Sequence, residues 1–92
     1  MGIVVQKFGG TSVASEESRA MLVAKVIEAR HDGKDVVVVV SAMGRKPAPY
    51  ATDTLLDFVL SVCRAAPARE RDAIAACGEI ISTVVVAAAL EA

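Results

Sequence analysis

The centre of the chain contains five consecutive valines in the stretch DVVVVV, residues Asp35–Val40. β-Branched residues of this kind are typical of strands. A strand with one face in water alternates apolar and polar residues, whereas this run has no polar residue after its aspartate. Such a strand is expected to be buried on both faces, as in a parallel sheet covered by helices. The run therefore predicts an α/β fold.

The beginning of the chain, Gly2–Phe8 (GIVVQKF), is a second strand-like segment, with β-branched residues near its start and a glycine pair after it. The residues between the two segments have a helical pattern. Strand, helix and strand within about forty residues form a βαβ unit, in which the two strands are parallel.

Capping signals define the helix between these strands. Ser12 or Ser15 can supply the N-cap oxygen, while Arg30 and His31 suit the last turn and Gly33 can take the left-handed conformation that ends the helix. Negative charge in the first turn, which the helix dipole favours, comes from Glu16 and Glu17. The apolar face is expected at Ala20, Val23, Ala24 and Ile27. We interpret His31 as a residue of the helix end rather than as a catalytic base.

The second half of the chain is expected to be mainly helical. A loop rich in glycine and proline leads to a helix that begins at Thr52 or Asp53. Its apolar face is expected at Leu56, Val59, Leu60 and Cys63. Pro67 ends this helix or opens the next. The remaining residues are predicted to be helical in two parts with a break near Gly78, and Val84–Val86 could instead form a strand.

Composition limits the classes of function. A net charge of −1 and an aromatic content of 3% argue against a nucleic-acid surface. No secretory signal is evident, and the longest apolar stretch, Ile80–Leu90, is too short to span a membrane. Cys63 and Cys77 are expected to be small buried hydrophobes rather than metal or redox residues. These features predict a cytoplasmic protein without a protein-bound metal site.

The apolar content is high for a chain of this length, because 54% of its 92 residues are hydrophobic and the mean hydropathy is +0.52. A small domain has proportionally more surface to cover with polar groups. The predicted strands also lack further strands to complete a doubly wound sheet. We therefore expect residues 1–92 to be the N-terminal fragment of a larger domain, or to pair through an apolar face.

The stretch QKFGGTS at the end of the first predicted strand is the main candidate site. Ligands of open α/β sheets collect at the carboxyl ends of strands. Gly9 and Gly10 allow positive φ and let an anion approach the backbone N–H groups, while Lys7 can hold its ammonium over that anion. A turn after a strand, with a solvated lysine, explains the same residues. The residues alone leave both interpretations open.

Other candidates also have two interpretations. Ser41 and Gly44 follow the second predicted strand, where Ser41 can face a ligand or cap a helix. Thr52 can be an N-cap. Glu79 lies in an apolar segment, where it is either exposed near a helix start or paired with a cationic ligand group, because burial of an unpaired charge is costly.

Four segments in order resemble aspartokinases. Val4–Ala14 (VVQKFGGTSVA) resembles their N-terminal signature, in which K-[FY]-G-G-[ST]-S opens the kinase domain. Val36–Gly44 (VVVVVSAMG) is similar to their second strand and nucleotide loop. Thr52–Phe58 (TDTLLDF) is similar to the helix that follows, and Gly78–Thr83 (GEIIST) to their G-E-x-x-S element. Together these segments cover nearly the whole chain.

The resemblance implies an amino acid kinase fold, a three-layer αβα sandwich on a mainly parallel sheet, with only its N-terminal portion present. It implies ATP- and Mg²⁺-dependent phosphorylation of the β-carboxylate of L-aspartate, the first step toward lysine, threonine and methionine. The rest of the kinase domain and the ACT regulatory domains are expected outside this chain. The fragment is expected to be inactive alone, and the full-length protein to be a homo-oligomer.

The resemblance also implies residue roles. Lys7 would be catalytic, stabilising charge on the phosphates during transfer. Phe8, Gly9 and Gly10 would line the ATP phosphate loop with Lys7, and Ser41 would contact the phosphate side of the nucleotide.

The resemblance places Thr52 at the aspartate substrate as a hydrogen-bond partner, and Glu79 at the substrate ammonium. The family commonly reaches the Thr-Asp helix within a few residues of S-A-M-G, whereas Arg45–Ala51 lengthens the loop here. Ile80 stands where many relatives have arginine. Two alternatives remain: another amino acid kinase acting on glutamate, acetylglutamate or UMP, and a non-catalytic interaction module that pairs through its apolar helices.

Overall fold

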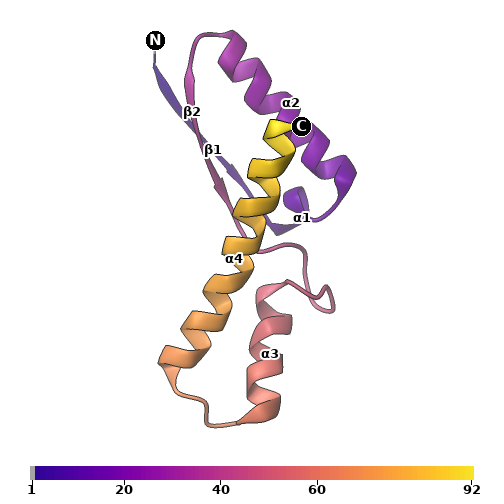
Figure 1. Ribbon diagram of the computed structural model, residues 1–92, viewed down its shortest axis with the longest axis vertical. Coiled ribbons are helices and arrows are strands. Elements are labelled where there is room, and N and C mark those ends of the chain that lie inside the picture. Colours follow the sequence, from indigo (N-terminus) through magenta and orange to yellow (C-terminus); the bar gives the residue numbers. More distant parts are fainter. Residues whose placement is uncertain (1) are drawn as a thin grey trace.

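The structure is a computed structural model that describes residues 2–92. Its elements in chain order are β1 (Ile3–Phe8), α1 (Gly10–Val13), α2 (Glu16–His31), β2 (Asp35–Val40), α3 (Thr52–Val62) and α4 (Ala68–Glu91). β1 and β2 pair in parallel, with Ile3 opposite Asp35 and Phe8 opposite Val40. Figure 1 shows α2 and α4 beside the sheet, with α3 and the first half of α4 extending away from it. The predicted βαβ unit is confirmed.

The two faces of the sheet differ in burial. One face is half-buried and supplies residues to the apolar core, namely Phe8, Val36, Val38 and Val40. The other face is open, and Ile3 is 74% exposed on it. The expectation that β2 is buried on both faces is therefore wrong for residues 2–92, because α2 and α4 cover the same face. The alternation of burial along β2 comes from its neighbours and not from its own side chains.

The core combines residues from three helices and the sheet. Its buried members are Val13, Leu22, Val26 and Val86. The face predicted for α2 is wrong, because Ala20, Ala24 and Ile27 are exposed. α2 carries apolar residues on several sides, so their spacing fitted more than one face. The face that packs against the sheet contains Leu22, which is larger than the alanines of the predicted face.

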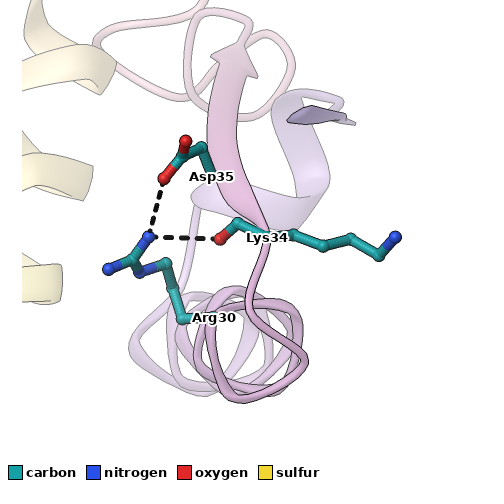
Figure 2. A network of polar contacts seen from close by, with 3 residues as sticks. All are labelled: Arg30, Lys34 and Asp35. Carbon is teal, nitrogen blue, oxygen red and sulfur yellow. Dashed lines mark hydrogen bonds and ion pairs between the residues drawn. The ribbon is translucent and has the colours of Figure 1, made fainter. Parts of the chain in front are cut away.

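Both ends of α2 follow the predicted signals. The Ser15 hydroxyl accepts a hydrogen bond from the Ser18 backbone N–H at 3.0 Å, which confirms Ser15 as the N-cap. Gly33 takes a φ of +78° just after the helix. Figure 2 shows Arg30 Nη1 donating to the Lys34 carbonyl at 3.2 Å and to Asp35 Oδ1 at 3.0 Å, while the Lys34 side chain extends away. These contacts tie the end of α2 to the start of β2.

α4 is one unbroken helix of 24 residues, so the predicted break near Gly78 and the alternative strand at Val84–Val86 are both wrong. Gly78 is buried where α4 meets the loop before α3. An added Cβ there would lie 2.9 Å from the Tyr50 carbonyl oxygen, 3.0 Å from Ala42 Cβ and 3.1 Å from Leu55 Cδ1. The glycine therefore serves close packing and does not end the helix.

α4 is long and apolar enough to cross a membrane by length and composition. The expectation that no stretch is long enough considered only Ile80–Leu90, and the helix begins twelve residues earlier, at Ala68. A mostly buried core helix of a soluble protein meets the same criterion, whereas only 17% of the apolar window of α4 is buried here, where α4 contacts α3, α2 and β2. Glu79 lies in its middle, where a membrane would make a charge costly.

The prediction that both cysteines are buried is wrong, because Cys63 and Cys77 are exposed free thiols. Cys63 is the C-cap of α3, and Cys77 lies on α4. α3 and α4 pack against each other beyond the end of the sheet, as Figure 1 shows, which leaves their outer sides in solvent.

Candidate functional site

The loops that follow the two strands are held together by backbone hydrogen bonds. The Ser41 N–H donates to the Phe8 carbonyl at 3.3 Å, and the Gly44 N–H donates to the Gly10 carbonyl at 2.9 Å. The first bond continues the sheet, and the second joins α1 to the loop after β2. The carboxyl ends of both strands therefore open onto one common edge, where ligands of parallel sheets bind.

Close approach, not an unusual backbone angle, requires glycine at position 10. A Cβ on Gly10 would lie only 2.6 Å from the Ala42 carbonyl oxygen. Neither Gly9 nor Gly10 has a positive φ, so the expectation that they use this freedom is wrong. Gly9 is the N-cap of α1 with a φ of −73°. The positive angle is instead at Gly44, with a φ of +72°.

An open pocket of about 200 Å³ lies at this edge of the sheet. Its lining includes Gly10, Ser41, Gly44, Arg45, Thr52 and Asp53. The structure thus brings together three predicted site residues, Gly10, Ser41 and Thr52, from three different parts of the chain. Thr52 is the first residue of α3, and the N-cap is Ala51, without a side-chain capping bond. The interpretation of Thr52 as an N-cap is therefore wrong.

The lengthened loop Arg45–Ala51 folds back on itself and onto α3. The Ala48 N–H donates to the Arg45 carbonyl at 2.7 Å, and Lys46 Nζ forms an ion pair with Asp57 of α3. The hydrogen bond and charge of Asp57, with a smaller contribution from Asp53, raise the pKa of Lys46 above its ordinary value. Lys46 is therefore cationic at neutral pH. The longer loop still brings Thr52 into the same pocket lining as Ser41.

Lys7 and Phe8 lie outside this pocket lining. Lys7 is the last-but-one residue of β1, opposite Val39, and its side chain is exposed. It lines a larger groove of about 420 Å³ along β1, together with Lys25 and Glu28 of α2. Phe8 packs against the apolar core. Lys7 is nevertheless only three positions before Gly10, which lines the pocket.

Glu79 is exposed in the middle of α4 and does not belong to the pocket lining described above. Glu79 is therefore exposed as the first interpretation expects, but in the middle of a helix and not at a helix start, and the exposed carboxylate remains accessible to a ligand. Its neighbour Gly78 packs against Ala42, which lines the pocket, so Glu79 follows directly after the contact between α4 and the pocket wall.

Sequence reasoning missed two charged residues of the pocket, Arg45 and Asp53. The sequence pattern indicates Arg45 only as part of a longer loop, and Asp53 only as a possible helix start. Their places directly after S-A-M-G and directly after Thr52 were the available signals. The pocket lining therefore combines one cationic and one anionic side chain with backbone and hydroxyl groups.

The whole described chain is similar to proteins of one known family. The model of the amino acid kinase family matches residues 2–92. The chain belongs to the amino acid kinase family. It is 52% identical over 85 residues to Aspartokinase 1 of Bacillus subtilis (strain 168), covering 92% of this chain and 21% of that protein. It is 46% identical over 91 residues to the aspartokinase of Mycobacterium tuberculosis (strain H37Rv), covering 99% of this chain and 20% of that protein.

Among solved structures, the aspartate kinase from Synechocystis matches this member of the amino acid kinase family with a TM-score of 0.84 and 35% identity. That match covers 99% of this chain and 14% of the other. The chain spans about a fifth of the length of the curated relatives it matches. The predicted resemblance to aspartokinases and the predicted fold class are both confirmed.

Proposed function

We propose that this chain is the N-terminal part of an aspartate kinase. A β-carboxylate oxygen of L-aspartate attacks the γ-phosphorus of ATP, the bond from that phosphorus to the β,γ-bridging oxygen breaks, and the products are 4-phospho-L-aspartate and ADP. The observation that carries the proposal is the convergence of Gly10, Ser41 and Thr52 on one pocket at the strand ends. The names of the similar proteins support aspartate as the acceptor.

The phosphate side of the reaction falls to the loops after the strands. Because side chains are absent at Gly9 and Gly10, phosphate oxygens can approach the backbone N–H groups there. The ammonium of Lys7, free in solvent at the end of β1, stabilises negative charge as the phosphoryl group moves. The Ser41 hydroxyl donates a hydrogen bond to a phosphate oxygen.

The amino acid side of the reaction falls to α3 and α4. The Thr52 hydroxyl is not used for capping, so it is available to hydrogen-bond the aspartate. Glu79 has no ion-pair partner within residues 2–92, and its carboxylate is free to meet the substrate ammonium. Phe8 supports the phosphate loop from the core side.

Mg²⁺ fits this arrangement as a partner of the phosphates. Residues 2–92 contain no group of three or more His, Cys, Asp or Glu side chains that could hold a metal ion. Kinases commonly hold Mg²⁺ through one or two carboxylates together with the phosphates. Asp53 is the carboxylate that this segment offers within the pocket. When bound, Mg²⁺ neutralises charge on the phosphate oxygens.

The full-length protein is proposed to carry the rest of the kinase domain and ACT regulatory domains, and to work in the cytoplasm as a homo-oligomer. The fragment 1–92 is proposed to be inactive alone.

An acceptor panel tests the proposed function. Full-length protein is incubated with MgATP and, in separate reactions, with L-aspartate, L-glutamate, N-acetyl-L-glutamate or UMP, and ADP release is measured. We expect ADP release with L-aspartate well above all other acceptors. Preference for another acceptor would assign a different kinase of the family. No release with any acceptor would favour a non-catalytic interaction module.

A further inference from the structure

Arg45 is the pocket residue for which the proposed function gives no role. It lines the 200 Å³ pocket, and its side chain is exposed. In the sequence it lies between Ser41 and Thr52, which line the same pocket. Its guanidinium has no hydrogen-bond or ion-pair partner within residues 2–92. By contrast, Arg19 donates to the Val13 carbonyl at 2.9 Å and Arg30 pairs with Asp35. Those arginines serve the fold, whereas the Arg45 guanidinium is free.

Backbone hydrogen bonds hold the chain on both sides of Arg45, and one of them joins the Ala48 N–H to the Arg45 carbonyl at 2.7 Å. Before Arg45, Gly44 is joined to Gly10 by a hydrogen bond of 2.9 Å and has the left-handed φ of +72°. After it, Lys46 is paired with Asp57 on α3. A side chain on a fixed backbone loses less conformational freedom when it binds a ligand than one on a mobile loop. We call the segment Arg45–Ala51, with its Lys46–Asp57 pair, the loop strap.

The chemistry of the guanidinium defines what Arg45 can bind. Arginine presents a planar set of donors that matches the two oxygens of a carboxylate or of a phosphate. Asp53 lines the same pocket, but no ion pair joins the two side chains. Both reactants of the proposed kinase carry anionic oxygens, and they meet in this pocket.

We propose that Arg45 is a substrate-binding residue, and that its guanidinium binds an anionic oxygen group of a reactant while the loop strap positions it. The group is a carboxylate of the amino acid or a terminal phosphate of the nucleotide. This inference rests on the proposed function and adds a cationic contact to the same pocket.

Steady-state kinetics of the full-length enzyme test the role of Arg45. We expect Arg45→Ala to raise the KM of one reactant about tenfold while the KM of the other stays within about twofold. A rise for L-aspartate assigns the carboxylate, and a rise for ATP assigns the phosphate. Arg45→Lys should recover part of the loss, because it keeps the charge but not the planar donors. Arg64→Ala, an exposed arginine beyond the end of α3, is the matched control and should change neither KM.

Unchanged KM values for both reactants in Arg45→Ala would overturn the proposal. Equal rises together with a lower melting temperature would overturn it as well, since they indicate a structural role. Lys46→Ala should shift the same KM by about threefold in the same direction, because it releases the strap. An unchanged KM in Lys46→Ala would overturn the positioning part.

Binding by calorimetry separates this proposal from the proposed function. L-Aspartate and ADP are titrated into the full-length wild-type protein and into Arg45→Ala, so that turnover is not needed. If the wild type binds a ligand but does not phosphorylate aspartate, weaker binding by Arg45→Ala still supports the anion contact. Equal binding by both proteins overturns it, and so does a wild type that binds neither ligand.

Discussion

Lys7 and Glu79 are charged side chains that the fold does not use. Both are exposed, and neither has an ion-pair partner within residues 2–92. Unpaired surface charges are common, so exposure alone assigns no function. What distinguishes these two is position: Lys7 lies at the end of the strand that leads into Gly9 and Gly10, and Glu79 follows the glycine that packs against the pocket wall. Their roles are therefore testable by substitution without loss of the fold.

Replacing Lys7 by alanine should lower kcat of the full-length enzyme about a hundredfold or more, because a preorganised positive charge on the transferring phosphoryl group is lost. The circular dichroism spectrum should stay unchanged, since Lys7 is exposed. Lys34→Ala is the matched control, because Lys34, the residue before β2, lines the same groove and its side chain points away from Arg30 and Asp35 (Figure 2). A near-normal kcat in folded Lys7→Ala would exclude its catalytic role.

For Glu79→Ala we expect the KM for L-aspartate to rise about tenfold, with the KM for ATP little changed, because the substrate ammonium loses a charged partner. Both constants come from initial rates at varied concentrations of each substrate. Glu70→Ala, which alters an exposed carboxylate in the first turn of the same helix, should leave both constants unchanged. Equal losses for aspartate and ATP would argue against the substrate contact.

At the scale of elements, the site depends on how closely the loops after β1 and β2 approach each other. Gly10 faces the Ala42 carbonyl, and Gly44 bonds to the Gly10 carbonyl, so the two loops form one unit. Gly78 plays a comparable role between α4 and the loop before α3. Each contact joins segments that are more than twenty residues apart, and each needs the absence of a side chain.

Gly10→Ala should destabilise the full-length protein by about 1–3 kcal/mol, the usual cost of forcing extra atoms into a packed contact. The atom it would meet is a backbone oxygen at 2.6 Å, which cannot rotate away. Gly9→Ala is the matched control: a Cβ there meets nothing within 4 Å, and the φ of −73° suits any residue. Urea unfolding measures the free energy of unfolding of both variants. Equal stability of the two variants would contradict the close approach.

Local signals predicted the first half of the chain well. The roles of Ser15, Gly33 and the valine run depend on residues close to them in the sequence. The two ends of α2 and the strands β1 and β2 of the βαβ unit were therefore predicted correctly. The break predicted at Gly78 is wrong because the glycine is required by close packing against Tyr50 and Ala42. These residues are distant in the sequence, so the pattern around Gly78 does not indicate the contact. The pocket was predicted in part: the candidates Ser41, Gly10 and Thr52 came together, whereas the charged loop residues were missed.

At the scale of the whole molecule, residues 2–92 present an open apolar sheet face. Val5 and Val37 are direct partners in the sheet and are 62% and 48% exposed. The core residues of α2 and α4 pack on the other face, and Figure 1 shows the C-terminal end of α4 beside α2. An apolar sheet face of this kind favours association when it is left uncovered. The helices of this segment therefore leave an apolar sheet face uncovered, and burial of this face in further contacts would be favourable.

We expect residues 1–92, expressed alone, to self-associate through this face. Sedimentation velocity should show species larger than the monomer, and the double variant Val5→Glu/Val37→Glu should shift the distribution toward the monomer. Val62→Glu, at an exposed position at the end of α3, is the control and should not. If the unmodified segment sediments as a stable monomer, the open face is not a driving force for association.

We propose that this segment supplies the phosphate loop and the substrate pocket of an aspartate kinase. The most direct measurement is a crystal structure of the full-length protein with L-aspartate and a non-hydrolysable ATP analogue. We expect phosphate oxygens at the backbone N–H groups of Gly9 and Gly10 with Lys7 nearby, and aspartate within hydrogen-bond distance of the Thr52 hydroxyl. Well-ordered ligands bound away from these residues would contradict it.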